Sequence, residues 1–435
     1  MKIWQIKLDR RKHLGLFAAT LFSIGSIVGG GIFALTGLAI KDSGYLSLVS
    51  FFIAFVLILI SALSYSQLSI IYPSDGGGYL FAKELLGNFW GFLTGWGIYI
   101  SSCIFIAFVL HIFGIYLSEF FIHSFSIVNA SIIAFIILFI AAVFNISETG
   151  WFEGTLVFFN ILILIIFIVT GLFHIQGFSS NYHASNFNSI FSTIEIIFIS
   201  FMGFQAITNI SQEVDSPKKN IPRAIFISLF SVLILYILID VVVLSVLKVN
   251  FGVSSVMLAA EKVMGPFSIL LPISALISTL SAGNSNMIAS SKTIIFMSDE
   301  KQISNKFSKV NKFGSPYISL IFLAIVVLSF LFFSNTIFLV DVAAVLVIFL
   351  FILINLSSFI FNIKYKHIRD RKSFRLFSDY IPLLGVIFSL FMFFYISIIT
   401  FEVACILFFI GIIYYELEKK SFFDRIYKFI KFRNG

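Results

Sequence analysis

The chain has 435 residues, of which 59% are hydrophobic and only 11% are charged, and its formal net charge is +8. A soluble domain is excluded, because a surface built from this composition would expose too much apolar area to water. Cys103 and Cys405 lie in apolar stretches and are interpreted as buried thiols. The histidines have no metal spacing and no catalytic or phosphate-binding motif occurs, so we expect no enzyme, no metal and no cofactor.

Stretches of about 20 apolar residues, each long enough to cross a bilayer, can be drawn twelve times along the chain. They lie near 14–40, 46–71, 89–117, 126–144, 152–174, 190–211, 223–247, 266–297, 316–334, 336–361, 381–400 and 402–418. The first stretch lacks a clear cleavage pattern and is interpreted as a retained helix. The sequence therefore predicts an all-α integral membrane protein with twelve transmembrane helices in a single domain, 1–435.

The basic residues predict the side that each connection faces. With the N-terminus inside, only Lys41, Lys248 and Lys262 of the 29 Lys and Arg residues fall outside. This pattern predicts a multi-pass protein of the cytoplasmic membrane with both termini in the cytoplasm. Nucleic-acid binding is the alternative explanation for the basic ends, but contact with anionic lipid explains them better, and we expect no nucleic-acid partner.

Four glycines interrupt the first span, namely Gly25, Gly29, Gly30 and Gly31. Within a bilayer, an unwound backbone is tolerated only where it lines a cavity or binds a ligand. A half-helix that begins after these glycines would direct free N–H groups and a positive dipole end at an anion such as a carboxylate. A close helix–helix contact is the alternative.

Gly203 lies in the middle of the sixth span, at the position that corresponds to the first break. This recurrence predicts two inverted five-helix repeats, 14–174 and 190–361, followed by two peripheral helices within 381–418.

Three stretches now carry a family resemblance: Gly25 to Phe33 (GSIVGGGIF), Tyr65 to Gly87 (YSQLSIIYPSDGGGYLFAKELLG) and Gly203 to Ile225 (GFQAITNISQEVDSPKKNIPRAI). Together and in this order they resemble the amino acid–polyamine–organocation superfamily, in particular its bacterial and archaeal amino acid permeases. The resemblance covers roughly residues 14 to 415. It implies a leucine-transporter-like fold of two inverted repeats in which helices 1 and 6 are broken.

The resemblance also implies a substrate pose. The α-carboxylate meets backbone N–H groups at the first break, and the α-amino group meets backbone carbonyls at both broken ends. Phe201 and Phe204 are candidates for an aromatic gate, with ordinary packing as the alternative. The implied substrate-binding residues are Ser26, Ile27, Gly29, Gly30, Gly31, Ile199, Phe201, Met202 and Gly203.

The sequence departs from the family at two positions that bear on coupling. Asn160 stands where many proton-coupled members have Lys, and Gln205 stands where many have Glu. Neither side chain titrates, so exchange, facilitated uptake or coupling through another group is favoured. Hydroxyls of the eighth span could contribute to a sodium site or bond to their own helix. The coupling or gating candidates are Asn160, Phe204, Gln205, Ser281 and Ser285.

The predicted function is secondary active or exchange transport of amino acids, with neutral amino acids favoured. The rivals are a cationic amino acid or polyamine carrier that uses Glu195 or Asp240, and a non-transporting amino acid sensor of the same fold. Asp341 and Glu402 are two further acids near outer ends of spans, and all four are interpreted mainly as structural carboxylates. The coupling ion, proton or sodium, and the oligomeric state are left open.

Overall fold

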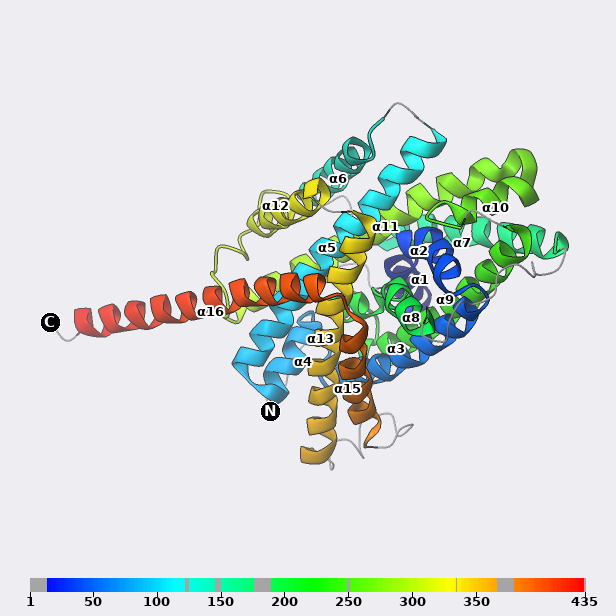
Figure 1. Ribbon diagram of the computed structural model, residues 1–435. Helices are drawn as coiled ribbons and strands as arrows, with labels where there is room; N and C mark the ends of the chain where they lie inside the picture. The colour runs from blue at the N-terminus through cyan, green and yellow to red at the C-terminus, as the bar shows by residue number, and fades with distance from the viewer. Residues whose placement is uncertain are drawn as a thin grey trace.

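The computed structural model describes residues 14–121, 125–144, 150–175, 189–248, 251–333, 335–365 and 379–433 (Figure 1). Within these ranges the chain is helical and contains no β-strand. The elements are α1 (Leu16–Ile27), α2 (Gly30–Ser43), α3 (Leu46–Ile71), α4 (Gly77–Leu86), α5 (Asn88–Phe120), α6 (Ile127–Val143), α7 (Gly150–Phe173), α8 (Ser189–Ser200), η2 (Phe204–Glu213), α9 (Pro217–Val246), α10 (Ser255–Met264), η3 (Gly265–Ile269), α11 (Leu270–Asp299), α12 (Tyr317–Phe333), α13 (Thr336–Lys364), α15 (Ile381–Met392), η4 (Phe393–Tyr395) and α16 (Ile398–Arg433).

The described helices follow the predicted spans in order. Eight are long and apolar enough to cross a membrane, the bent pair α1–α2 adds a ninth, and three shorter apolar helices lie where the other three spans were predicted. Several boundaries differ. The seventh span begins at Pro217 rather than 223, α11 begins at Leu270 rather than 266, the eleventh ends at Tyr395 rather than 400, and the last begins at Ile398 rather than 402. The division into repeats at 14–174 and 190–361 stays a prediction.

α5 forms the centre of the molecule. It packs against α4, α6, α11, α12 and α13, and nearly all of its side chains are buried. Because the middle of α5 is buried among these helices, it links α11 with α4, α6, α12 and α13.

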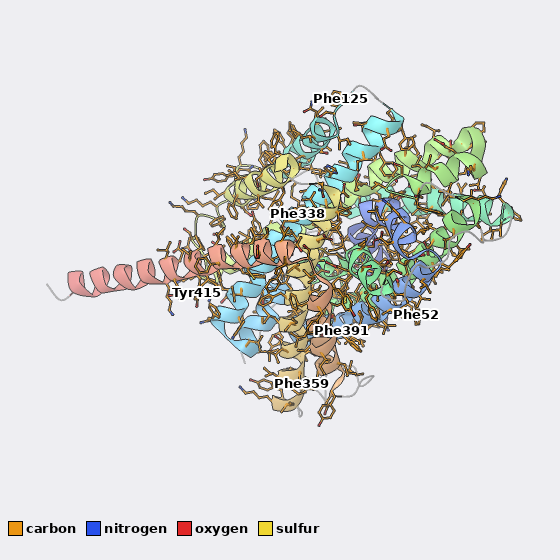
Figure 2. All side chains as sticks on the ribbon, in the orientation of Figure 1. Phe52, Phe125, Phe338, Phe359, Phe391 and Tyr415 are labelled. Atoms are coloured by element: carbon orange, nitrogen blue, oxygen red, sulfur yellow. The ribbon has the colours of Figure 1, made fainter. Side chains whose placement is uncertain are left out.

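The outer helices present apolar side chains outward, as a lipid-facing surface requires. Phe52 of α3 and Phe391 of α15, labelled in Figure 2, are 56% and 42% exposed. α16 extends away from the other helices toward the C-terminus (Figure 1). Cys103 is buried in α5 as predicted, but the prediction for Cys405 was wrong: it is exposed, because α16 packs against the protein on one face only.

Polar side chains between α3 and α13 satisfy one another. Asn355 accepts a hydrogen bond from Ser64 at 2.7 Å and donates one to Ser61 at 2.9 Å. Ser358 donates to Gln67 at 2.7 Å. Such bonds are a usual means of joining helices in a membrane, where burial in lipid tails provides no hydrophobic drive for association.

Candidate functional site

The first predicted break is present between α1 and α2. α1 ends at Ile27, α2 begins at Gly30, and the two axes differ by 46°. No side chain of the described residues caps the N-terminus of α2. The first-turn N–H groups, including those of Gly30 and Gly31, therefore have no partner within their own helix.

The second break follows α8. The chain leaves the helix at Ser200, turns, and resumes as the 3₁₀ helix η2 at Phe204. Gly203 has φ = 114°, a conformation that favours glycine, and a Cβ there would lie 2.2 Å from the carbonyl oxygen of Ser26. The lone glycine that was weak evidence in the sequence thus lies in direct contact with the end of α1.

The two breaks are joined by a residue that the sequence analysis did not single out. The hydroxyl of Tyr236, on α9, donates to the carbonyl oxygen of Ser200 at 2.8 Å and lies 3.4 Å from that of Ile27. A buried tyrosine in an apolar helix needs a partner for its hydroxyl, and this need is the one feature of the sequence that could have singled out Tyr236. The sequence does not contain the location of that partner.

Two hydroxyls at the breaks have no partner. Ser26 and Ser200 are buried, and neither Oγ atom forms a hydrogen bond within the described part of the chain. Leaving a buried hydroxyl unpaired costs about 1–3 kcal/mol. Free hydroxyls, free N–H groups and backbone carbonyls therefore meet in one buried place, where a small polar ligand would satisfy them.

A chain of hydrogen bonds between uncharged groups connects the first break to α7 and α11. Asn160 of α7 donates to Ser278 of α11 at 3.0 Å, and Ser278 donates to the carbonyl oxygen of Val28. Ser274 donates to the amide oxygen of Asn160. Asn160 thus connects α7 and α11 to the break without a titratable group.

The two serine candidates of α11 differ in their surroundings. Ser285 donates to the carbonyl oxygen of Ser281 at 3.0 Å, which is bonding within its own helix. The Oγ atom of Ser281 faces the first span, since a Cβ at Gly25 would lie 3.1 Å from it.

The remaining candidates lie at the second break and are engaged in packing or in the turn itself. Phe201 stacks between Phe55 and Tyr236, with ring centroids 6.0 and 5.2 Å away, and is fully buried. Phe204 packs similarly on Tyr65 at 5.6 Å.

Three main-chain groups of the same turn are already bonded. The side chain of Gln205 folds back and accepts from the N–H of Gly203 at 3.2 Å. The carbonyl of Ile199 accepts from the N–H of Met202 at 2.9 Å. The carbonyls of Ile27 and Ser200 are also bonded, to the N–H of Gly29 and to the hydroxyl of Tyr236, so a ligand would use the second lone pair of each carbonyl oxygen.

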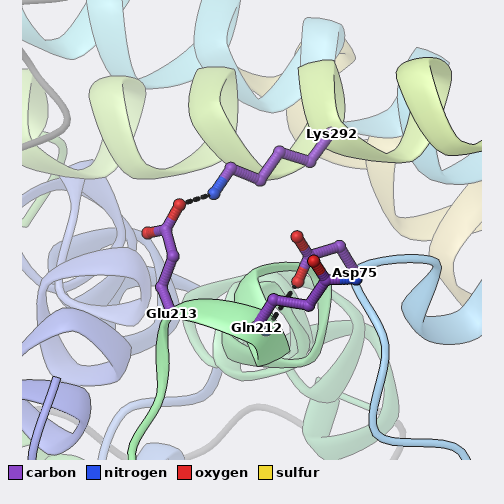
Figure 3. A network of polar contacts seen from close by, with 4 residues as sticks. All are labelled: Asp75, Gln212, Glu213 and Lys292. Carbon is purple, nitrogen blue, oxygen red and sulfur yellow. Dashed lines mark hydrogen bonds and ion pairs between the residues drawn. The ribbon is translucent and has the colours of Figure 1, made fainter. Parts of the chain in front are cut away.

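The side of the protein on which α1 begins, hereafter the N-terminal side, is closed by polar contacts (Figure 3). Glu213, at the end of η2, forms an ion pair with Lys292 of α11. Asp75, before α4, accepts from the N–H of Gln212 at 2.8 Å, and the N–H of Leu14 donates to the carbonyl of Glu213 at 2.7 Å. The broken spans are thus fixed to α4 and α11 at this end.

The comparison with known proteins settles the family. The family described as amino acid permease matches residues 14–415. This chain belongs to that family. The permease is 26% identical over 339 residues to the branched-chain amino acid permease BcaP of Bacillus subtilis. The match covers 71% of this chain and 72% of the relative.

Two further relatives show the breadth of the family. The permease is 29% identical over 310 residues to the inner membrane transport protein YbaT of Escherichia coli, covering 68% of this chain and 72% of that one. It is 27% identical over 258 residues to human cationic amino acid transporter 4, and the match covers 53% of this chain and 40% of that transporter. The superfamily resemblance is confirmed, and the protein is a multi-pass membrane protein of an amino acid transport family.

Proposed function

We propose that this permease moves neutral amino acids across the cytoplasmic membrane by alternating access, with the substrate held between the two breaks and both termini in the cytoplasm. The observation that supports this most strongly is the meeting of the uncapped N-terminus of α2 with the carbonyl oxygens of Ile27 and Ser200. An amino acid carries an anion and a cation on one carbon atom, so it needs donors and acceptors at this spacing. Gly30 and Gly31 would donate to the carboxylate.

Neutral specificity rests on the side chains at the breaks. Residues 25–33 and 199–205 include no acidic residue. The rings of Phe201 and Phe204 pack there with aromatic residues of α3 and α13, including Phe55 and Phe351. A cationic side chain in this place would find no counter-charge within these two stretches, which is costly in a low-dielectric interior. The relative named as a branched-chain permease agrees with an apolar substrate side chain.

The cationic rival is weakened by the structure around Asp240. Its carboxylate accepts from Ser47 of α3 at 2.8 Å and is fully buried between α3 and α9, one helical turn beyond Tyr236. It therefore serves the contact between two helices rather than either break.

The contacts at the N-terminal side support alternating access. They join the start of α1, η2, α4 and α11, so these contacts would have to separate for the site to open toward that side. A transporter of this kind opens one side at a time around a fixed site.

The test is a thermal-shift panel of the twenty amino acids and common polyamines on detergent-purified protein, followed by liposome counterflow with each hit. A ligand at about 100 times its Kd stabilises the protein by about 2.7 kcal/mol. We expect leucine, isoleucine, valine or an aromatic amino acid to stabilise and to exchange. Hits confined to arginine, lysine or polyamines would contradict neutral specificity, and binding without counterflow would indicate a sensor.

A matched pair of variants tests the location. Ser26→Ala should lower affinity without lowering thermal stability, because the hydroxyl has no protein partner among the described residues. Ser329→Ala, on α12 and far along the chain from either break, is the control and should change neither.

A further inference from the structure

Glu195 is a buried carboxyl that the proposed substrate pose does not use. It lies on α8, five residues before Ser200, and is only 7% exposed. Five residues of α-helix place it about 7–8 Å from the second break, toward the side opposite the N-terminal side, hereafter the far side. Its Oε1 atom has no hydrogen-bond partner within the described residues.

A second carboxyl, half-buried, lies on a helix that packs against α8. Asp341 lies near the start of α13, which packs against α8, and its charge acts on Glu195. The elements that pack against α8 are α2, α3, α13 and η4, and α9 reaches the end of α8 through the hydroxyl of Tyr236. Apart from the cations at the start of α9, the titratable groups on these elements are Lys41, Asp42, Tyr65, Tyr236, Asp240, Asp341, Lys364 and Tyr395. Among them, Asp341 is the one whose charge is felt by Glu195.

Among the described neighbours of Asp341, no lysine or arginine balances the pair. α5 contributes His111, whose Nδ1 atom lies 2.9 Å from the hydroxyl of Thr336, at the same end of α13. α16 contributes Glu402, which is exposed. The lysines of α4 and α13, Lys83 and Lys364, lie at the N-terminal side of the protein.

Two ionised carboxylates held together at low dielectric repel each other, and an unpaired buried charge is costly in itself. A proton on one carboxyl removes both costs. Separation of α8 from α13 removes the repulsion as well, because it lets water reach each group. The number of bound protons must therefore differ between a far side that is closed and one that is open.

We propose that Glu195 and Asp341 form a proton-binding site on the far side, and that proton uptake there favours closure of α8 against α13. The inference rests on the proposed function, since it is alternating access that requires the far side to open and close. Closure takes one proton from solution and forms one O–H bond on a carboxylate oxygen, and opening returns that proton. The pair would supply the titratable group that Asn160 and Gln205 cannot.

The experiment follows opening at the far side without substrate. Val345 is buried and lies one helical turn from Asp341 on the same face of α13. In a Cys405→Ser background, Val345→Cys is labelled with a membrane-impermeant thiol reagent from the far side. Its labelling rate is divided by that of Glu261→Cys, an exposed position on α10, which corrects for the pH dependence of thiol chemistry.

We expect the corrected rate to fall about tenfold from about pH 8 to about pH 5 when both carboxyls are present. Glu195→Gln should abolish this dependence, and Asp341→Asn provides the same test if the first variant does not fold. Glu402→Gln, which removes an exposed acid, should retain the full dependence. The proposal is overturned if the corrected rate of the parent protein does not vary with pH. It is also overturned if Glu195→Gln and Asp341→Asn both keep the same pH dependence as the parent protein. Slowing by added sodium at fixed pH would also overturn it, in favour of a metal cation.

Counterflow at equal pH on both sides, measured in parallel, separates this proposal from the proposed function. Transport without pH-dependent labelling leaves the function standing and overturns the proton site. If labelling depends on pH through Glu195 but no amino acid is transported, the proton site stands and the proposed function is overturned.

Discussion

Tyr236 places one hydroxyl where two interrupted helices meet, so its removal is informative at the scale of a single residue. Tyr236→Phe keeps the ring contacts with Phe51 and Phe201 and removes the donor to Ser200. We expect a loss of about 1 kcal/mol of stability and at least a roughly tenfold lower counterflow rate, because the broken ends lose their shared donor.

Tyr99→Phe is the matched control for that variant. It removes a buried hydroxyl that donates to the carbonyl of Ser319 at 2.6 Å, between α5 and α12. Its loss of stability should be similar, while its transport should stay near that of the wild type. Equal loss of transport in both variants would mean that Tyr236 acts only through stability.

Gly203 is the glycine whose backbone conformation the second break requires. Gly203→Ala adds a Cβ at φ = 114° and forces it against the carbonyl of Ser26, so we expect destabilisation of at least about 2 kcal/mol. Thermal unfolding in detergent measures this. Gly252→Ala, where a Cβ would meet nothing within 4 Å, should unfold at the wild-type temperature. A folded Gly203→Ala protein of unchanged stability would contradict the tight turn.

Gly30 is a less suitable place to test the substrate pose than the sequence indicated. A side chain there would block the approach of a carboxylate, but its Cβ would also lie 2.8 Å from the side chain of Ile112. Loss of binding in Gly30→Val would therefore combine a blocked site with a strained contact to α5. Ser26→Ala avoids this, because it only removes atoms.

At the scale of elements, the contact of η2 with α11 controls the N-terminal side. Glu213 and Lys292 are each mostly shielded from solvent, so their ion pair is stronger than one on an open surface. Lys292→Met should shift the equilibrium toward opening of this side by about 1–3 kcal/mol. Labelling of Ser211→Cys, buried on η2, would report this as at least a roughly fivefold faster reaction.

Lys83→Met is the control for that variant, since it breaks the ion pair of α4 with Glu300 on the same side without touching η2. It should leave the labelling of Ser211→Cys unchanged. The exchanged pair, Lys292→Glu with Glu213→Lys, should restore part of the closure. Faster labelling in all three proteins would show that general loosening, and not this ion pair, opens the side.

At the scale of the whole molecule, four connections lie together. The segment directly before α1, the loop before α4, the end of η2 and the end of α11 meet on the N-terminal side. The positive-inside pattern of the sequence predicts that this side faces the cytoplasm. We expect an impermeant thiol reagent added to intact cells to label Glu261→Cys and not Asn305→Cys, both in a Cys405→Ser background.

Inverted membrane vesicles should give the opposite result. Asn305 is an exposed residue of the connection between α11 and α12, and Glu261 is exposed on α10. Labelling of Asn305→Cys from outside intact cells would reverse the proposed orientation. Ser373 is a second position in a basic connection, but it lies outside the described residues.

The sequence by itself determined the helical class, the twelve spans and the place of both breaks. These depend on apolar length and on glycine, which act within a single span: Gly29 to Gly31 and Gly203 interrupt their own helices. It also indicated that Asn160 and Gln205 cannot titrate.

Only the tertiary structure decided which groups meet. The carbonyls of Ile27 and Ser200 share Tyr236, Glu213 meets Lys292, and α8 with Glu195 packs against α13 with Asp341. Each pair joins residues far apart in the chain, and apolar spans look alike in sequence whichever neighbours they pack against. The same reason explains Cys405, because an apolar stretch does not distinguish a face turned to protein from one turned to lipid.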